Sequence, residues 1–239
     1  MSASAVESFP RRRVRWRPSY RIVPSRFPPR GLFDRVADPA DLEATFAVES
    51  LTNDRLRDEV GELSRVPREE RMTGPGATPV MAAFTHVNPA GSRFSDGSFG
   101  VFYAAKSEAT AVRETVFHRE RFLADSAQPP MTIEMRVYQV DVDGALRDLR
   151  GQAEAKPLLD PYSYAQSQRY GVQAYTASES GIVYPSVRDA GGECVAVLRA
   201  SALSPAVQGR HFGYIWDGSC ITDVVTLGES GIEPHGDRR

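Results

Sequence analysis

The sequence is poor in cysteine and has no long hydrophobic run, and each absence excludes a class of protein. Its 239 residues include two cysteines, Cys194 and Cys220, which are too few for a disulfide framework and lack the C-x-x-C spacing of redox and zinc sites. No apolar stretch reaches the roughly 20 residues of a transmembrane helix. The N-terminal arginines are not followed by the apolar core of a secretory signal. We therefore expect a soluble, cytoplasmic protein that does not bind membranes.

A strong excess of charge of one sign is also absent. The formal net charge of −2 at pH 7 gives the chain no general attraction to nucleic acid. Neither a GxxxxGK[ST] loop nor a GxGxxG turn between a strand and a helix occurs, which excludes P-loop and Rossmann nucleotide sites. We predict no metal site, because no H-E-x-x-H pattern joins the scattered histidines, His86, His118, His211 and His235.

The composition is that of an ordinary globular protein, with 41% hydrophobic and 25% charged residues, enough for one substantial core. Positive charge gathers in RRRVRWRPSYR, residues 11–21. We expect residues 1–18 to form a basic, flexible tail, residues 19–230 a single domain, and residues 231–239 a second flexible tail. The alternative for the basic stretch is an arm that binds nucleic acid, with an affinity that falls as salt rises.

Short strands and separated helices, without regular βαβ alternation, predict an α+β fold. We expect a compact mixed or antiparallel β core flanked by helices. The clearest helix covers residues 107–125, where Ser107 is a suitable N-cap. A helical insertion is expected at about 39–73. The individual predictions are helices at 39–50, 53–63 and 163–178, and strands at 20–23, 81–87, 131–144, 181–187, 194–200 and 221–227.

A glycine-rich loop with a single arginine precedes the clearest helix. In GSRFSDGSFGVFYAA, residues 91–105, Arg93 lies in the loop and Tyr103 on the short strand after it, and Glu114 follows inside the helix. Because a strand and the helix after it commonly pack together, we expect these three side chains to converge. Glu114 and His118 share one face of the helix. The competing interpretation of that face is a solvated surface with local charge pairs.

These residue types suit the cleavage of a glycosidic bond. An arginine presents a planar fork of donors to a phosphate or pyrophosphate, and a tyrosine offers a flat face and a hydroxyl. A single carboxylate stabilises an oxocarbenium-like cation, but an ordinary glycosidase needs a second carboxyl group to protonate its leaving group. NAD does not, because nicotinamide leaves as a neutral base. The set is sufficient for cleaving NAD, although it is not unique to that reaction.

A serine near the end of a predicted strand is a further candidate. Ser186 follows Pro185, and Arg188 stands two residues later. One interpretation is a turn serine that caps a backbone donor. The G-x-S-x-G elbow of a serine nucleophile is absent. We therefore expect Ser186 to be a hydrogen-bond partner for a ligand phosphate or ribose.

Four short motifs in this order resemble the RES-domain toxins, a family named for its Arg, Glu and Ser residues. The resemblance extends from about Tyr20 to about Ala202. The spacing between the arginine, tyrosine and glutamate motifs is similar to that of the family. The motifs are GSRF with Arg93, VFYAA with Tyr103, AVRETVFH with Glu114, and GIVYPSVRD with Ser186.

The resemblance implies a single RES domain, related in fold to ADP-ribosyltransferases, that consumes NAD as a substrate and needs no further cofactor. Family members are bacterial toxins of toxin–antitoxin systems, each paired with an Xre-type antitoxin that covers the active site, so nucleic acid would be bound only through the antitoxin. The expected reaction breaks the nicotinamide–ribose bond with water or inorganic phosphate, as an NAD glycohydrolase or NAD phosphorylase. Transfer of ADP-ribose to a protein is the alternative.

The resemblance also implies a role for each site residue. Arg93 is expected to bind the phosphates of NAD or an attacking phosphate. Tyr103 is expected to contact the nicotinamide riboside, and Glu114 to orient the ribose hydroxyls and stabilise the developing cation. These three are the expected catalytic residues. The expected NAD-binding residues are Arg21, Arg93, Tyr103, Ser186 and His118. Two alternatives outside this reaction are a nucleic-acid-binding or interaction module that uses residues 11–17, and a domain that binds a nucleotide without turning it over.

Overall fold

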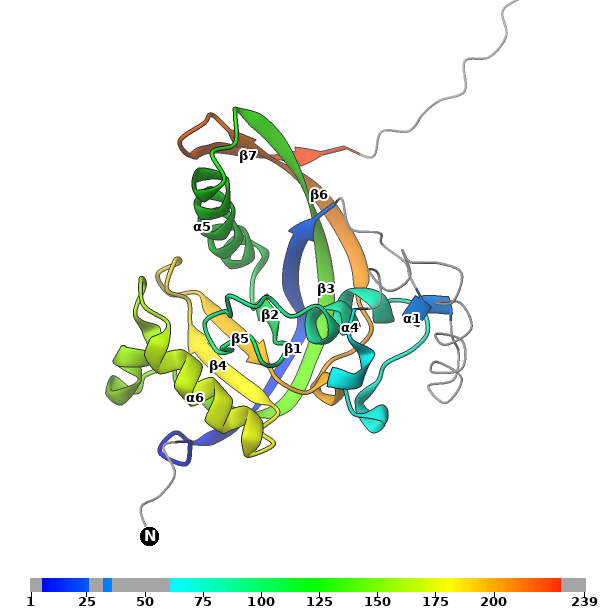
Figure 1. Cartoon of the computed structure of the whole chain (residues 1–239), viewed down its shortest axis with the longest axis vertical. Coiled ribbons are helices and arrows are strands. Elements are labelled where there is room, and N and C mark those ends of the chain that lie inside the picture. Colours follow the sequence, from blue (N-terminus) through cyan, green and yellow to red (C-terminus); the bar gives the residue numbers. More distant parts are fainter. Residues whose placement is uncertain (1–5, 26–31, 36–60, 229–239) are drawn as a thin grey trace, which may run out of the picture.

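The computed structural model describes residues 6–25, 32–35 and 61–228. Strands and helices mix without regular alternation, so the α+β class is confirmed (Figure 1). The strands are β1 (Arg11–Pro24), β2 (Phe102–Ala105), β3 (Met131–Asp148), β4 (Gly181–Pro185), β5 (Glu193–Val197), β6 (Val207–Trp216) and β7 (Ile221–Leu227). The α-helices are α1 (Leu32–Arg35), α4 (Ala77–Thr85), α5 (Glu108–Asp125) and α6 (Ala165–Thr176), and the 3-10 helices are η1 (Leu63–Arg65), η2 (Arg68–Glu70), η3 (Ala153–Leu159) and η4 (Ala200–Ala202).

A seven-stranded sheet in the order β1-β2-β5-β4-β3-β6-β7 organises the described part of the chain. A further pairing between β1 and β3 closes β1, β2, β5, β4 and β3 into a ring, from which β6 and β7 extend. The short β3–β4 pairing is parallel and the other pairings are antiparallel. The expected mixed β core is therefore confirmed.

Strand β3 spans 18 residues and joins the ring to its extension. On one edge it pairs with β1, and on the other edge with β6 and, at its end, with β4. Its side chains divide between two buried apolar clusters. Tyr138 and Val140 belong to the first cluster, and Val137 belongs to the second. Because a strand points successive side chains to opposite faces, β3 supplies both clusters at once.

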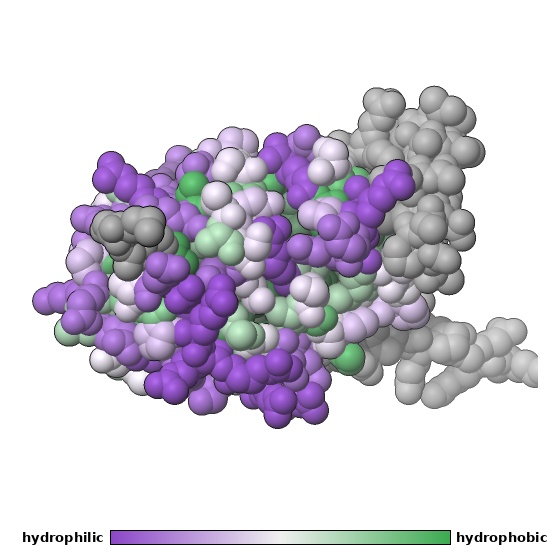
Figure 2. Space-filling view, turned by 90° about the horizontal axis from the view of Figure 1, so that it is seen from below, coloured by the Kyte–Doolittle hydropathy of each residue, from purple (hydrophilic) through white to green (hydrophobic). Residues whose placement is uncertain are grey.

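Each cluster is covered by different helices. The first includes Val80 and Met81 of α4, whereas the second includes Ala111 of α5 and Tyr170 of α6. In Figure 1, α5 lies beside β6 and β7, and α6 lies beside β4 and β5. The face drawn in Figure 2 is mostly hydrophilic, with hydrophobic residues in small scattered groups, as expected when most large apolar side chains are buried.

The predicted flexible tail at residues 1–18 is wrong over its described part, where Val6 and Phe9 are already buried. Residues from Arg11 form strand β1, which pairs with β3 from Arg11↔Arg147 to Pro24↔Met135. Val14 and Trp16 are buried between exposed arginines, which is the period-two pattern of a half-buried strand. The density of arginines concealed this pattern from the prediction. The predicted strand at 20–23 is part of the same β1.

Two further predictions of secondary structure are wrong. Residues 81–87 were expected to be a strand, but Ala77–Thr85 form helix α4, in which Val80 and Phe84 are buried one turn apart. The other error is strand β6, which the sequence did not reveal. It begins at the exposed Val207 and contains glycines at Gly209 and Gly213, and glycine is uncommon in strands.

The other predictions that fall on described residues agree with the structure, whereas the short helices α1, η3 and η4 were not predicted. α5 begins after Ser107, whose hydroxyl accepts a hydrogen bond from the backbone of Thr110 at 3.2 Å. The predictions at 131–144, 163–178, 181–187, 194–200 and 221–227 correspond to β3, α6, β4, β5 and β7.

Much of the predicted insertion at about 39–73, including the helix at 39–50, lies outside the described residues, as does the predicted tail at 231–239. The described part of the insertion, from residue 61 onward, contains the short helices η1 and η2. Among the helices that the structure describes, none combines the length and apolar character needed to span a membrane.

Candidate active site

Glu114 of α5 is held by a serine that lies 72 residues later in the sequence. The Ser186 hydroxyl donates a hydrogen bond to Oε1 of Glu114 at 2.5 Å. The Cys194 thiol on β5 donates to the same oxygen at 3.8 Å. Among the described residues, none donates a hydrogen bond to the other oxygen, Oε2 of Glu114. The carboxylate is therefore fixed through one oxygen and offers the second to a ligand.

The hydroxyl of Ser186 has no bonding capacity left. Besides donating to Glu114, it accepts hydrogen bonds from the backbone N–H groups of Arg188 at 3.2 Å and Asp189 at 2.9 Å. A hydroxyl has one donor and two acceptor positions, and all three are in use. Ser186 thus orients Glu114 in this structure, whereas the sequence predicted a direct contact to phosphate or ribose.

The turn that carries Ser186 is fastened to the start of α5. Thr110 donates to Asp189 at 2.7 Å, and Arg113 forms an ion pair with the same carboxylate. These contacts, the hydrogen bond from Thr110 first, hold the pKa of Asp189 below its usual value. Gly192 permits the close approach, since a Cβ there would lie 2.7 Å from the Thr110 side chain. The turn and the helix therefore position Glu114 together.

Tyr103 ties strand β2 to the glycine-rich loop. Its hydroxyl accepts from the backbone N–H of Phe94 at 2.9 Å and bonds the Ser92 hydroxyl at 2.8 Å. Burial raises the pKa of Tyr103 to about 12, so the phenol stays neutral at physiological pH. The hydroxyl holds the loop, and the ring is the part of Tyr103 that a ligand can contact.

Arg93 is buried, and one of its nitrogens is already occupied. Nη1 donates to the carbonyls of Leu158 at 3.4 Å and Asp160 at 2.9 Å. The guanidinium carbon lies 4.5 Å from the centre of the Tyr164 ring. No carboxylate forms an ion pair with Arg93 among the described residues. An anion would therefore meet Nε and Nη2 of Arg93, while Nη1 anchors the segment before α6.

Arg21 of β1 lies on a cleft of about 790 Å³. Its Nη1 donates to the Tyr103 carbonyl at 3.1 Å, and its Nε is enclosed without a hydrogen-bond partner. Burial lowers the pKa of Arg21 to about 10, which still leaves it charged at neutral pH. Tyr103 lines the same cleft, together with Tyr138 and Arg119. The enclosed Nε is out of reach of a ligand, but Arg21 lines the cleft, and a guanidinium beside an open cleft suits an anionic ligand.

Four of the predicted site residues converge in one cluster. Ser186 bonds Glu114 directly. The pKa of the Cys194 thiol is raised, by burial first and then by the charge of Glu114, while the charge of Arg93 lowers it, so both charged groups lie close to the thiol. Tyr103 bonds the backbone of the residue after Arg93. Tyr103 is also the member of this cluster that lines the cleft, so it connects the cluster to Arg21.

His118 is near the cluster but does not bond Glu114. His118 is exposed, but desolvation by the surrounding protein lowers its pKa. The charge of Glu114 acts to raise this pKa, and the charge of Arg188 acts to lower it further. The imidazole is therefore neutral at physiological pH. His118 does not line the cleft, and its predicted contact with NAD stays a prediction.

Sequence reasoning passed over two neighbours of Glu114. The sequence did not suggest that Cys194 belongs to the site; the structure places it opposite Tyr184 on the paired strands β4 and β5. Arg188 stacks on α5, with its guanidinium carbon 3.3 Å from the centre of the Phe117 ring, and donates to the Pro161 carbonyl. Only the proximity of Arg188 to Ser186 in the sequence hinted at its position.

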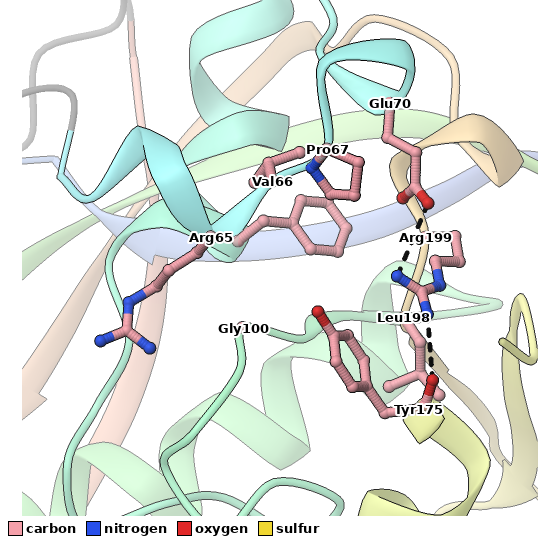
Figure 3. A pocket seen from close by; sticks show the side chains of 9 residues that line it. Arg65, Val66, Pro67, Glu70, Gly100, Tyr175, Leu198 and Arg199 are labelled. Carbon is pink, nitrogen blue, oxygen red and sulfur yellow. Dashed lines mark hydrogen bonds and ion pairs between the residues drawn. The ribbon is translucent and has the colours of Figure 1, made fainter. Parts of the chain in front are cut away.

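A second concavity, shown in Figure 3, lies beside the chain segment that follows η1. Arg199 pairs with Glu70 at 3.6 Å and donates to the Tyr175 carbonyl at 3.0 Å. The volume is about 10 Å³, which accommodates a single water molecule at most. The cleft beside Tyr103 is therefore the better candidate for a ligand of nucleotide size.

The family model of the RES domain matches residues 63–217. The uncharacterized protein y4oC of Sinorhizobium fredii (strain NBRC 101917 / NGR234) is 31% identical over 219 residues, which are 90% of this chain and 89% of that protein. A chain in the crystal structure of the M. tuberculosis MbcT–MbcA toxin–antitoxin complex matches with a TM-score of 0.46 and 15% identity, over 93% of this chain and 89% of that chain.

Proposed function

The chain belongs to the RES-domain family, and from this membership and the geometry around Glu114 we propose that it is an NAD-consuming enzyme that breaks the nicotinamide–ribose bond. The observation that carries the proposal is the hydrogen bond of 2.5 Å between Ser186 and Glu114. It joins two motifs that lie 72 residues apart and leaves one carboxylate oxygen for a substrate.

The reaction needs one carboxylate and no separate acid. As the glycosidic bond breaks, its electron pair passes to the nicotinamide nitrogen and neutralises the positive charge there. The ribosyl carbon becomes electron-deficient, and Oε2 of Glu114 is placed to stabilise that cation and to accept a hydrogen bond from a ribose hydroxyl. The oxygen of water or of inorganic phosphate then bonds to the ribosyl carbon, and a proton is released when water is the acceptor.

Two arginines, Arg93 of the cluster and Arg21 of the cleft, suit the phosphates of the same substrate. Arg21 and Arg93 carry guanidinium nitrogens that form no ion pair among the described residues, and guanidinium groups bind phosphate through paired hydrogen bonds. The cleft of about 790 Å³ beside Arg21 and Tyr103 lies within the usual range for ligand sites. We propose that the pyrophosphate of NAD lies toward this cleft.

We further propose that the protein acts as the toxin of a toxin–antitoxin pair. The resemblance to RES-domain toxins supports this role, and an Xre-type antitoxin that covers the site is the partner it implies. Transfer of ADP-ribose to a protein is the alternative fate of the same ribosyl cation. The products distinguish the acceptors.

The test is incubation of the purified protein with NAD, with and without inorganic phosphate, followed by analysis of the products. We expect nicotinamide release, with free ADP-ribose as the second product if water is the acceptor and a phosphorylated ADP-ribose if phosphate is. Glu114→Gln should abolish release. Glu108→Gln, on the same helix, removes a carboxylate that pairs with Arg210 at 3.4 Å and should retain full activity. Full turnover by Glu114→Gln, or no turnover by the wild type, would contradict the proposal.

A further inference from the structure

Tyr184 is a buried residue of the second apolar cluster that has no role in the chemistry described above. It lies on β4 and is 5% exposed. Its register partner on β5 is Cys194, and residues directly opposite on antiparallel strands point to the same face of a sheet. Because the Cys194 thiol contacts Glu114 at 3.8 Å, Tyr184 stands beside the carboxylate.

A second contact places Tyr184 near the arginine of the cluster. Its ring meets the ring of Phe94 edge-on, with centroids 5.1 Å apart and an angle of 67°, and Phe94 directly follows Arg93. The pKa of Tyr184 is raised well above its ordinary value, by burial first, and then by Cys194, Glu114 and Tyr103. The residues that act on Tyr184 are therefore those of the proposed active site.

The hydroxyl of Tyr184 is unusual because nothing in the described protein uses it. Buried tyrosine hydroxyls generally find a hydrogen-bond partner, yet none of the described residues bonds this one. It is also not among the fully enclosed atoms without partners, which are Arg21 Nε, Arg136 Nε, Arg147 Nε and the Tyr170 hydroxyl. The ring is therefore buried while the hydroxyl opens to solvent-accessible space.

We propose that Tyr184 is a substrate-binding residue whose hydroxyl hydrogen-bonds the nicotinamide riboside half of NAD. This proposal rests on the proposed function, because it uses the same substrate and the same site. The hydroxyl stays neutral at physiological pH, so it suits the uncharged carboxamide and ribose hydroxyl groups of that half and not the phosphates. It cannot serve as a general base under these conditions.

Tyr170 offers a matched control. It is buried to the same degree, at 4% exposure, but its hydroxyl is fully enclosed without a partner. The charges that act on it are those of Arg147 and Glu179, and neither belongs to the cluster around Glu114. Substitution of either tyrosine by phenylalanine removes one oxygen and keeps the ring.

The experiment compares nicotinamide release by the wild type, Tyr184→Phe and Tyr170→Phe, together with their thermal unfolding. Loss of one hydrogen bond to a neutral group should lower kcat/KM of Tyr184→Phe about three- to tenfold, with unchanged unfolding. Tyr170→Phe should match the wild type. Binding of ADP-ribose, which lacks nicotinamide and its carboxamide, distinguishes the groups that Tyr184 can contact. If Tyr184→Phe binds ADP-ribose as tightly as the wild type, the hydroxyl contacts the carboxamide. If Tyr184→Phe binds it more weakly, the hydroxyl contacts a ribose hydroxyl.

The outcomes distinguish the proposed role of Tyr184 from the proposed function on which it rests. If the wild type releases nicotinamide and Tyr184→Phe does so equally well, the role of Tyr184 is refuted and the proposed function stands. A loss of activity that is matched by a loss of thermal stability identifies a packing role and also overturns the proposal. If the wild type neither binds nor cleaves NAD, both proposals fall together.

Discussion

Arg147 of β3 and Glu179, just after α6, form a buried ion pair. Nη2 of Arg147 donates to Oε1 of Glu179 at 2.8 Å, and their side chains are 10% and 1% exposed. Arg11, at the start of β1, adds a bidentate contact to the same carboxylate at 2.7 and 2.9 Å. One carboxylate thus holds together the N-terminal strand, the longest strand and the end of a helix.

Replacement of that carboxylate should destabilise the protein strongly. Glu179→Gln leaves the buried Arg147 without its counter-charge, and breaking a buried pair costs about 3–5 kcal/mol. Denaturant unfolding at neutral pH measures the effect. Asp143→Asn is the control, because this carboxylate pairs with the exposed arginines Arg15 and Arg17, and surface pairs contribute about 1 kcal/mol or less. Equal losses in the two variants would contradict the central role of Glu179.

The same carboxylate predicts a loss of stability in acid. Burial alone would raise the pKa of Glu179, but the hydrogen bonds from Arg11 and Arg147 outweigh it and hold that pKa below the ordinary value of 4.5. Because this pKa is lower in the folded protein, the ionised carboxylate stabilises the fold fully at pH values above the unfolded-state pKa. The stabilisation disappears as the pH falls through the folded-state pKa. Melting temperatures measured from pH 7 down to pH 3 should fall less steeply in Glu179→Gln than in the wild type. Parallel curves would refute the assignment.

Adjacent positions of β1 should respond very differently to truncation. Trp16 is 7% exposed within the core, whereas its neighbour Arg15 points outward with a side chain 65% exposed. Trp16→Ala should cost about 3–5 kcal/mol, and Arg15→Ala less than about 0.5 kcal/mol. Urea unfolding of the two variants measures this difference. Similar small costs would mean that residues 11–18 behave as the tail that their charge suggested.

Ser186→Ala tests whether this serine orients Glu114 or holds the substrate. Loss of a hydrogen bond to a charged group is worth about 1.5–3 kcal/mol, so we expect kcat to fall by about ten- to a hundredfold, with little change in KM. Steady-state kinetics of nicotinamide release supply both constants. A rise in KM with kcat intact would restore the direct ligand contact that was predicted from the sequence.

Gly192→Ala tests the attachment of the turn to α5. The new Cβ would lie 2.7 Å from Thr110 and 2.8 Å from the Asp189 carboxylate, so the turn must move away and carry Ser186 with it. Overpacking of this kind costs about 1–3 kcal/mol, and nicotinamide release should fall as well. Gly228→Ala is the control, since its Cβ meets nothing within 4 Å. Unchanged activity of Gly192→Ala would show that Glu114 does not depend on the turn.

Periodic patterns predicted much of this fold, and they failed where charge or glycine concealed them. The helix from Ser107 and the strand Met131–Asp148 were recognisable, because the cap of the helix and the alternation along the strand agree with the final structure. In β1 the alternation was present, but the arginines that flank Val14 and Trp16 suggested a solvated segment. Pairing with β3, a long-range contact, decides the conformation of β1, and no local pattern contains that information.

The proximity of the four candidate residues was more predictable than the contacts that each of them makes. Arg93, Tyr103, Glu114 and Ser186 converge as expected from their motifs. The sequence could not reveal that the Ser186 hydroxyl is saturated or that one nitrogen of Arg93 is occupied by the carbonyls of Leu158 and Asp160. Hydrogen-bond saturation depends on backbone groups from other parts of the chain, and residue type and spacing do not specify them.

The pairing of β1 with β3 has a consequence for biosynthesis. Ser19 donates to the carbonyl of Val140, a residue 121 positions later in the chain. At a translation rate of about 5–20 residues per second, β1 waits on the order of ten seconds for its partner. During that interval Val14 and Trp16 are exposed on an unpaired strand, which is a hazard for aggregation. The arginines that alternate with them serve as gatekeepers of the nascent chain, so the basic character of this segment protects the strand until its partner has been made.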